Sequence, residues 1–446
     1  MISSEPIISV GLIERAREIR GTFNGPFELP SSITVSGPFR MRSESGRVVL
    51  YDSGGVEVHR SDELRCRPLD CATFTLSDVT IGINFHWERK ENQIFEGDLR
   101  IRSNDDGSLI VINEVRLERY LQSVISSEMN AEAPIELLKA HAITSRSWLV
   151  AMLERQEQFR RGATQSPPLH VAADEVVRWY DREDHRTFDV CADDHCQRYQ
   201  GVTKIFSKTV TEAIEVTRGV FLVSGNAICD ARYSKACGGR TELFENCWEE
   251  KPHPYLQSVS DSTEEAPPLV NEEDAERWIG SSPDVYCNTT DGNIVRQILP
   301  SFDRETTDFF RWKVEYSREQ MEEILTAKSG IDFGAVQDIV PIKRGTSGRI
   351  VKLKITGTKR TMIVGKELEI RRWLSKTHLY SSAFSVNIQR DPEGLPKNFV
   401  FLGAGWGHGV GLCQIGAAVM ATKGYTAEEI LKHYFLRADI RKLYEG

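Results

Sequence analysis

The chain has 446 residues, and its 56 Lys and Arg against 65 Asp and Glu give a formal net charge of −9. With 40% hydrophobic residues it can bury extended cores, so a mainly disordered chain is excluded, and its length suits about two or three domains. An acidic chain without concentrated Lys and Arg is a poor general nucleic-acid binder, because phosphate contact favours clustered cations.

The first part of the chain shows the alternation of apolar and polar residues that is typical of β-strands. Segment 79–87 has an apolar residue at every second position, which predicts a half-buried strand. Segments 95–103 and 109–112 flank Asn-Asp-Asp-Gly at 104–107, whose residues tolerate positive φ, so a hairpin is predicted there. We therefore predict an N-terminal β-rich region over residues 1–110.

Helical spacing begins near Glu114, where apolar residues recur every three or four positions. The pattern predicts a short helix that ends before Ser126. A longer helix is predicted from Pro134, because proline is favoured in the first turn of a helix. Lys139 and Arg146 lie seven residues apart on one face of this second helix.

Beyond the second helix the patterns are mixed. Residues 164–204 lack regular periodicity and are predicted to form a loop-rich protrusion, whereas residues 262–400 show both strand and helix patterns. A glycine-rich and then helical segment follows at 403–435. The predicted fold class is α+β, with one mixed α/β region over residues 111–446 after the N-terminal β-rich region.

Membrane and export signals are weak in this sequence. No run approaches the ~18 apolar residues of a membrane helix, and the N-terminal segment lacks a basic flank followed by an apolar core. We expect no transmembrane segment. A cytoplasmic protein and an exported protein whose signal is absent from this sequence both remain open.

The first of four local signals is Glu128, which follows two serines at the junction between the predicted helices. A carboxyl group buried at such a junction loses solvation and can hold a proton near neutral pH, as a general acid must. The alternative is an ordinary glutamate that caps a helix or faces solvent.

The second signal is the segment 234–241, Ser-Lys-Ala-Cys-Gly-Gly-Arg-Thr, which follows a predicted strand. Gly238 and Gly239 let the backbone approach a ligand closely and expose N–H groups, with Ser234 beside them. A plain tight turn is the alternative, and without further information it is the better interpretation.

The third signal is the alternation of glycines from Gly403 to Gly411, with Gln414 just beyond. Glycine costs conformational entropy and fills no space, so this composition is poorly explained by core packing. The pattern would display Trp406 and His408 on a thin backbone, where a sugar or peptide could lie against them. We favour a functional interpretation of this segment.

The fourth signal is a cluster of metal-binding residue types: His185, Cys191, His195 and Cys196. Two thiolates and two imidazoles can complete a tetrahedral zinc shell and hold a loop-rich segment together. The spacing is not a common zinc-finger pattern, so a Cys191–Cys196 disulfide or unbound residues remain alternatives. His170 is a reserve fourth ligand.

Taken together, these segments resemble the stage II sporulation protein D (SpoIID) and amidase-enhancer family. The resemblance runs in family order over about residues 111–436. The matching segments are Val115–Leu121 leading into Ser127-Glu128-Met129, Leu137–Arg146, Gly238–Glu242 with Trp248, Pro254–Asp261, and Gly405–Gly416.

This resemblance implies a lytic transglycosylase, a carbon–oxygen lyase that cleaves the bond between N-acetylmuramic acid and N-acetylglucosamine in peptidoglycan without adding water. The family's catalytic glutamate falls on Glu128. One carboxyl group suffices, because it protonates the leaving oxygen and then takes a proton from the C6 hydroxyl to close a 1,6-anhydro ring. Most glycosidases instead need a second carboxylate to handle a water or form a covalent intermediate.

The resemblance also implies a structural zinc, since some members have His and Cys ligands where His185, Cys191, His195 and Cys196 lie. The sequence departs from the family pattern at Cys237 and Cys413, for which either a disulfide or two free thiols is open. A Cys247–Cys287 bridge is open as well. The N-terminal region matches the family less specifically.

We expect a saccharide groove beside Glu128, lined by Lys139, Arg146, Ser234, Gly238, Gly239, Trp406, His408 and Gln414. The expected partner is peptidoglycan, which places the protein at the cell envelope. The main alternative is a non-catalytic peptidoglycan-binding activator of a cell-wall amidase. A zinc hydrolase centred on residues 185–196 is a weaker alternative, because two cysteines favour a closed structural site.

Overall fold

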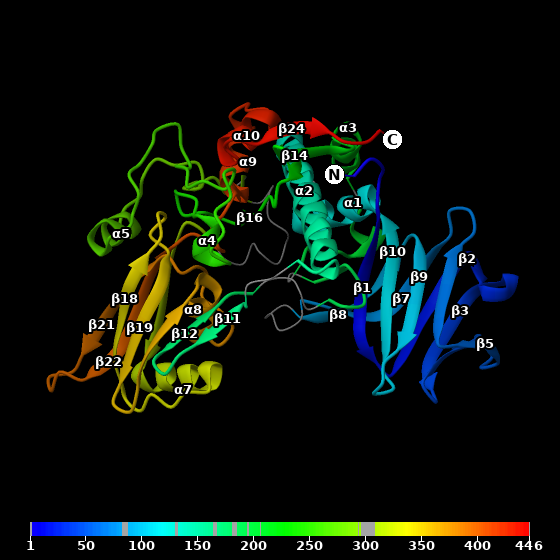
Figure 1. Cartoon of the computed structure of the whole chain (residues 1–446), viewed down its shortest axis with the longest axis horizontal. Helices are drawn as coiled ribbons and strands as arrows, with labels where there is room; N and C mark the ends of the chain where they lie inside the picture. The colour runs from blue at the N-terminus through cyan, green and yellow to red at the C-terminus, as the bar shows by residue number, and fades with distance from the viewer. Residues whose placement is uncertain are drawn as a thin grey trace. The chain divides into compact units, whose positions relative to one another are not determined.

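The computed structural model describes residues 2–82, 88–129, 133–163, 167–180, 185–193, 196–205, 207–292, 294–295 and 308–445. The chain forms two compact units. Unit 1 comprises Met1–Glu132, Arg182–Val220 and Lys442–Gly446, and unit 2 comprises Ala133–Asp181 and Phe221–Arg441. Both contain helices and strands (Figure 1), which confirms the predicted α+β class.

Unit 1 is built on an eleven-stranded sheet with the strand order β13-β1-β10-β9-β6-β2-β3-β4-β5, in which β7 pairs with both β2 and β8. Its helices are α1 (Leu117–Glu128), α3 (Lys208–Val216) and the 3-10 turns η1 (Pro30–Ser32) and η2 (Gly201–Lys204). Its strands are β1 (Ile7–Ala16), β2 (Glu18–Leu29), β3 (Ile33–Glu44), β4 (Arg47–Tyr51), β5 (Glu57–Ser61), β6 (Glu63–Pro68), β7 (Thr73–Ile81), β8 (Arg89–Phe95), β9 (Asp98–Ser103), β10 (Leu109–Arg116) and β13 (Val190–Cys191).

The predicted hairpin joins β9 to β10. Leu109 pairs with Ser103, and the N–H of Gly107 donates to the Asn104 carbonyl oxygen at 2.9 Å across the turn. The strand predicted at 79–87 is the end of β7, which the structure describes to Ile81, and residues 83–87 lie outside the described residues. The described residues up to Ser103 form the strands β1–β9, and the separate N-terminal region over residues 1–110 stays a prediction.

Helix α1 runs three residues further than the sequence pattern indicated. It includes Ser126 and Ser127 and ends at Glu128, where the N–H of Met129 donates to the Ile125 carbonyl oxygen at 3.0 Å. Serine is only mildly unfavourable inside a helix, and burial of the last turn outweighs that preference. Glu128 is therefore the last residue of a helix, not part of a loop.

Unit 2 contains several smaller sheets, ordered β11-β12-β20-β19-β18, β17-β22-β21, β15-β14-β24 and β16-β23. Its helices are α2 (Ile135–Arg160), α4 (Phe244–Cys247), α5 (Glu272–Ile279), α7 (Arg318–Ser329), α8 (Glu367–Trp373), α9 (Gln414–Thr422) and α10 (Ala427–Tyr434). Its strands are β11 (Leu169–Val171), β12 (Glu175–Arg178), β14 (Val220–Ser224), β15 (Ala227–Ile228), β16 (Tyr233–Ser234), β17 (Arg311–Ser317), β18 (Val336–Arg344), β19 (Ile350–Gly357), β20 (Thr361–Gly365), β21 (Phe384–Arg390), β22 (Pro396–Ala404), β23 (Leu412–Cys413) and β24 (Asp439–Lys442).

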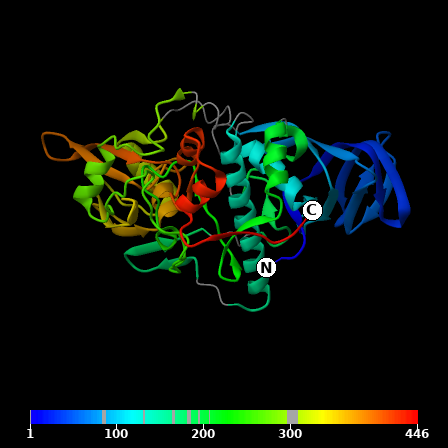
Figure 2. The same cartoon turned by 90° about the horizontal axis from the view of Figure 1, so that it is seen from above.

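Two packing centres stabilise unit 2. One lies between the sheets and helices α7 and α8, where Phe333, Trp373 and Phe401 are among the buried residues. The other surrounds α2, which contacts α9 and α10 (Figure 2). Pro134 is the N-cap of α2, which confirms the predicted helix start. In the described parts of the chain, no helix has both the length and the apolar character that a membrane crossing needs.

The segment 164–204, predicted as a loop-rich protrusion, is divided between the two units. Its first part contributes β11 and β12 to the sheet of unit 2, where Val176 pairs with Val364. Its later part belongs to unit 1, where Val190 and Cys191 pair with Val10 and Gly11 of β1. Short strands that pair with distant strands carry too few residues to show periodicity, which explains why the sequence indicated only loops.

Candidate functional site

Glu128 is half-buried at the end of α1 in unit 1, the unit that also contains the predicted metal ligands. Its Oε1 accepts a hydrogen bond from the backbone N–H of Arg198 at 3.2 Å. The side chain of Arg198 donates to the carbonyl oxygen of Ser127 at 3.4 Å. The carboxyl group is thus oriented by a neighbouring segment while part of its surface stays exposed, as a group that must exchange protons with a substrate requires.

Three of the four predicted metal ligands lie together. The ligand atoms of His185, Cys191 and Cys196 are within 4.8 Å of one another, and His185 Nε2 lies 3.4 Å from Cys196 Sγ. His195 lies outside the described residues. His170, the reserve ligand, is exposed on β11 in unit 2. The donor set of one imidazole and two thiols fits a metal such as zinc.

The metal-ligand segment continues directly into the segment that contacts α1. Pairing of β13 with β1 fixes Cys191, and the N–H of Tyr199 donates to the Ala192 carbonyl oxygen at 3.0 Å. The N–H of Gln200 then donates to the Ser123 hydroxyl on α1, also at 3.0 Å. Only one residue separates Cys196 from Arg198 in the sequence. The position of the Arg198 N–H, which donates to Glu128, therefore depends on the contacts that fix Cys196.

The glycine-rich segment of unit 2 has a steric origin. Gly405, Gly407, Gly409 and Gly411 all have positive φ, between 74° and 94°. A Cβ on Gly409 would lie 2.4 Å from the guanidinium carbon of Arg349, and a Cβ on Gly411 would lie 2.1 Å from a backbone oxygen. The alternating glycines are therefore needed for close packing, whether or not they also display side chains. The sequence pattern did not indicate this packing role.

The two glycine-containing motifs of unit 2 meet. Strand β16 pairs in parallel with β23, with Ser234 opposite Cys413, and Ala236 forms a bridge with Trp406. A Cβ on Gly238 would lie 2.9 Å from the backbone nitrogen of Gly405. The tight-turn interpretation of the second motif is therefore supported by its packing against the third.

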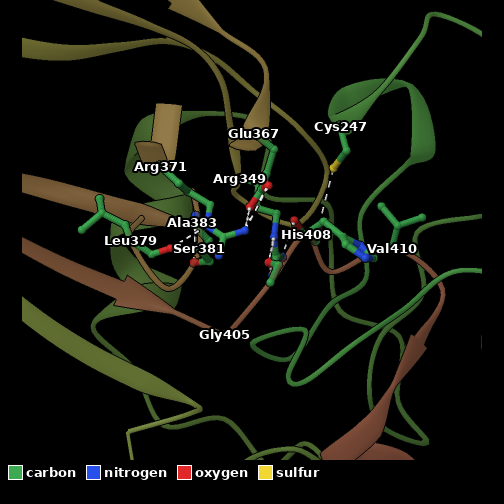
Figure 3. Close-up of polar contacts among 12 residues, drawn as sticks. Cys247, Arg349, Glu367, Arg371, Leu379, Ser381, Ala383, Gly405, His408 and Val410 are labelled. Carbon is green, nitrogen blue, oxygen red and sulfur yellow. Dashed lines mark hydrogen bonds and ion pairs between the residues drawn. The ribbon is translucent and has the colours of Figure 1, made fainter. Parts of the chain in front are cut away.

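Trp406 and His408 are partly exposed, but protein groups cover much of each ring. Trp406 stacks on Phe309 with ring centroids 4.8 Å apart and contacts Tyr380 at 4.4 Å. The His408 ring lies edge-on to the Trp248 ring. Its Nδ1 accepts a hydrogen bond from the Val410 N–H at 3.0 Å (Figure 3). Phe309 thus occupies one face of the Trp406 ring, so a sugar cannot stack on both faces.

Two of the predicted groove residues with long side chains are buried. Arg146 is 0% exposed and Gln414 is 2% exposed. The side-chain nitrogen of Gln414 lies 3.0 Å from His141 Nε2, and His141 Nδ1 lies 3.3 Å from the hydroxyl oxygen of Ser145. We therefore revise the roles of Arg146 and Gln414 from saccharide contact to support of α2 and α9.

The remaining predicted groove residues vary in accessibility. Lys139 forms an ion pair with Glu136 at 2.7 Å and is partly exposed. Ser234 is 6% exposed, and its hydroxyl oxygen has no hydrogen-bond partner among the residues that the structure describes. All the predicted groove residues belong to unit 2, whereas Glu128 belongs to unit 1, so their joint use as one groove stays a prediction.

Sequence reasoning missed two buried charged residues that support the motifs. Arg349 donates to the Cys237 carbonyl oxygen at 3.0 Å and to the Gly407 carbonyl oxygen at 3.0 Å, which joins the two motifs. Glu242 accepts hydrogen bonds from the backbone and side chains of Thr346 and Ser347. Glu242 lies in the motif Gly238–Glu242, whereas no local sequence pattern singles out Arg349.

A second cluster of possible metal ligands lies in unit 2. The ligand atoms of Cys237, Asp261, Cys287 and Cys413 are buried and lie within 4.8 Å of one another, so this cluster could hold a metal ion. Burial raises the pKa of Cys237, of Cys287 and of Asp261. At Cys413 burial is outweighed by hydrogen bonds from Cys237 and Cys287, which hold the pKa of its thiol well below the usual range.

The disulfides left open by the sequence are absent. None of the nine cysteines, all of which fall within the described ranges, forms a disulfide. Cys247 donates to the carbonyl oxygen of His408 at 3.7 Å (Figure 3), whereas Cys287 lies against Cys237. The sequence could not reveal this pairing, because Cys237 and Cys287 are 50 residues apart.

Two families and several relatives match parts of this chain. Residues 105–223 match the stage II sporulation protein (SpoIID) family, and residues 242–411 match a domain of unknown function, DUF8618. An uncharacterized protein of Brachyspira hyodysenteriae is 25% identical over 75% of this chain and 68% of its own length. Stage II sporulation protein D of Bacillus subtilis is 23% identical over 73% of this chain and 74% of its own length.

A further relative is the amidase enhancer of Bacillus subtilis, 22% identical over 71% of this chain and 39% of its own length. The SpoIID match spans Glu128 and the three described metal ligands. The fold is that of a two-unit α+β protein with a glutamate beside a His and Cys cluster. Over residues 105–223 the chain is similar to the SpoIID family, and the relatives that it matches along more of its length include stage II sporulation protein D and an amidase enhancer.

Proposed function

We propose that this protein acts on the bacterial cell wall as a peptidoglycan lytic transglycosylase. The observation that supports this most is the placement of Glu128. It ends α1 in the Ser-Glu-Met motif, is partly exposed, and is oriented by the Arg198 N–H. The relatives named for sporulation and for amidase enhancement support a cell-wall role.

The reaction needs one carboxyl group in two protonation states. Protonated Glu128 gives its proton to the glycosidic oxygen as the bond to the anomeric carbon breaks, so the leaving sugar departs with a neutral hydroxyl. The carboxylate then takes the proton of the C6 hydroxyl, whose oxygen bonds to the anomeric carbon and closes the 1,6-anhydro ring. Glu128 ends the cycle protonated, and no water is consumed.

The His185, Cys191 and Cys196 cluster fits a structural zinc in this proposal, with His195 as the fourth ligand. Zinc with four protein ligands supplies folding free energy, not an open position for substrate. Here it would fix the segment that leads to Arg198 and thereby the orientation of Glu128. The chain's own groups, not the ion, carry out each proton transfer.

Glycan strands that lack stem peptides test the proposal directly. The full chain should release products with 1,6-anhydro ends, which mass spectrometry separates from hydrolysed ends by the mass of one water. Glu128→Gln should abolish them, because the amide cannot donate and then accept a proton in this way. Glu212→Gln, an exposed glutamate on α3 of the same unit, is the matched control and should retain activity. Equal product from wild type and Glu128→Gln would refute the assignment.

The similarity to an amidase enhancer favours a second candidate, a binding protein that stimulates a cell-wall amidase. It predicts faster amidase turnover in mixtures and no new glycan ends. The Glu128→Gln variant separates the two functions. If the variant stimulates the amidase as well as wild type does and neither makes anhydro ends, the binding function is supported and the transglycosylase proposal fails.

A further inference from the structure

The buried cluster of Cys237, Asp261, Cys287 and Cys413 is separate from the site proposed above and belongs to unit 2. These residues are between 0% and 2% exposed. They come from four segments: the turn after β16, two loops, and the end of β23. Three thiols and a carboxyl group brought together from distant segments are unusual in a protein interior, because a buried polar group is costly unless a partner satisfies it.

Neither packing nor a disulfide accounts for the whole set. The sulfur atoms of Cys237 and Cys287 are 3.7 Å apart, whereas a disulfide has a bond of about 2.0 Å. If that bond formed, Cys413 and Asp261 would remain together as a buried thiol and carboxylate. A divalent cation, in contrast, compensates all four groups at once.

The spacing of the ligand atoms suits tetrahedral coordination. Zinc–sulfur bonds of about 2.3 Å at tetrahedral angles place two sulfurs about 3.8 Å apart. The Cys237–Cys287 separation of 3.7 Å is close to this value, and the remaining ligand atoms lie within 4.8 Å of one another. Thiolate-rich sites select zinc over magnesium or calcium, which prefer oxygen ligands.

The surroundings of the ligands resemble the supporting shell of a metal site. Cys413 Sγ accepts from the N–H groups of Cys237 at 3.2 Å and Gly416 at 3.4 Å. The Asp261 carboxylate accepts from the Cys287 N–H at 2.7 Å and from the Tyr434 hydroxyl at 2.5 Å. Such bonds orient ligands and stabilise their charged forms.

A nearby cation can offset the remaining negative charge. Three thiolates and one carboxylate around a divalent ion leave a net charge of −2. Burial lowers the pKa of the Arg311 guanidinium to about 10, and the Cys287 and Cys237 thiols oppose this shift. Its guanidinium donates to the backbone carbonyl oxygens of Gly238 and Trp278, which neutralise no charge.

We propose that Cys237, Asp261, Cys287 and Cys413 form a second, structural zinc site. All four positions of the tetrahedron are filled by protein, so the ion takes no substrate. It ties the Gly238 turn to the start of α9 and holds the two glycine-containing motifs of unit 2 together. This inference does not depend on the transglycosylase function.

Metal analysis of the full chain tests this inference. The first site is removed by the double substitution His185→Ala, Cys196→Ser, and zinc is measured by mass spectrometry after gel filtration. About one zinc per chain should remain in this variant. Adding Cys413→Ser should remove it, whereas adding Cys229→Ser, a buried cysteine outside both clusters, should not.

Cobalt provides a readout that needs no substitution within the second cluster. The double variant loaded with Co²⁺ should show the sulfur-to-cobalt charge-transfer bands and the intense visible bands of a tetrahedral thiolate site. This remains decisive if Cys413→Ser fails to fold. Absence of both zinc and the cobalt bands in a folded double variant would overturn the proposal, as would a disulfide found by peptide mapping among Cys237, Cys287 and Cys413.

Discussion

His141 offers a quantitative test of how unit 2 is assembled. Its ring on α2 is 0% exposed and contacts Gln414 of α9 at 3.0 Å. Burial, with a smaller contribution from the charge of Lys235, lowers the pKa of His141 from 6.5 to about 3. In the unfolded chain the ring is solvated and has an ordinary pKa of about 6.5.

The sign of the pH dependence follows from proton binding. Between the folded pKa of about 3 and the unfolded pKa of 6.5, the unfolded state binds the extra proton. Stability is therefore fully present above pH 6.5 and is lost as the pH falls through this window. From pH 7 to pH 5 the linkage relation gives a loss of about 2 kcal/mol from His141 alone.

The variant His141→Gln removes the titrating ring and keeps a polar side chain toward Gln414. Urea unfolding followed by tryptophan fluorescence measures unit 2, because every tryptophan except Trp87 lies there. The stability difference between wild type and variant should shrink by about 2 kcal/mol between pH 7 and pH 5. His170→Gln, at an exposed position on β11, should leave the wild-type pH dependence unchanged. A parallel loss in wild type and His141→Gln would refute the argument that burial keeps His141 neutral.

Two further substitutions test the packing of the motifs. Gly409→Ala places a Cβ against Arg349 at positive φ and should cost about 3 kcal/mol in urea unfolding, whereas Gly394→Ala, at positive φ in open space, should cost about 1 kcal/mol. Glu242→Gln replaces a buried carboxylate oxygen, which accepts hydrogen bonds, by an amide NH2 group that faces other donors, and should lower stability by about 3 kcal/mol. The exposed Glu250→Gln should change stability by less than about 0.5 kcal/mol. Equal losses within either pair would contradict the respective argument.

Local patterns in the sequence were sufficient for several features. The α+β class, the hairpin before β10 and the start of α2 at Pro134 follow from alternation, turn residues and the preference of proline for helix starts. The motif containing Glu128 and the ligands His185, Cys191 and Cys196 lie within short segments. Residues close in sequence stay close in space, so their spacing already limits the chemistry that they can share.

Other features depend on contacts between distant segments, which only the tertiary structure decides. Burial of Arg146 and Gln414 removes them from saccharide contact, although their sequence positions suggested a groove. The division of segment 164–204 arises because its short strands pair with partners far away in the sequence.

The cysteines show the same limit most clearly. The sequence left Cys237 with Cys413 and Cys247 with Cys287 as open pairings, whereas folding brings Cys237, Cys287 and Cys413 together around Asp261. Nothing in local spacing encodes such a meeting, because the free energy that selects it comes from burying and pairing whole segments. The residue types were visible in the sequence, and the constellation that they form was decided by the fold.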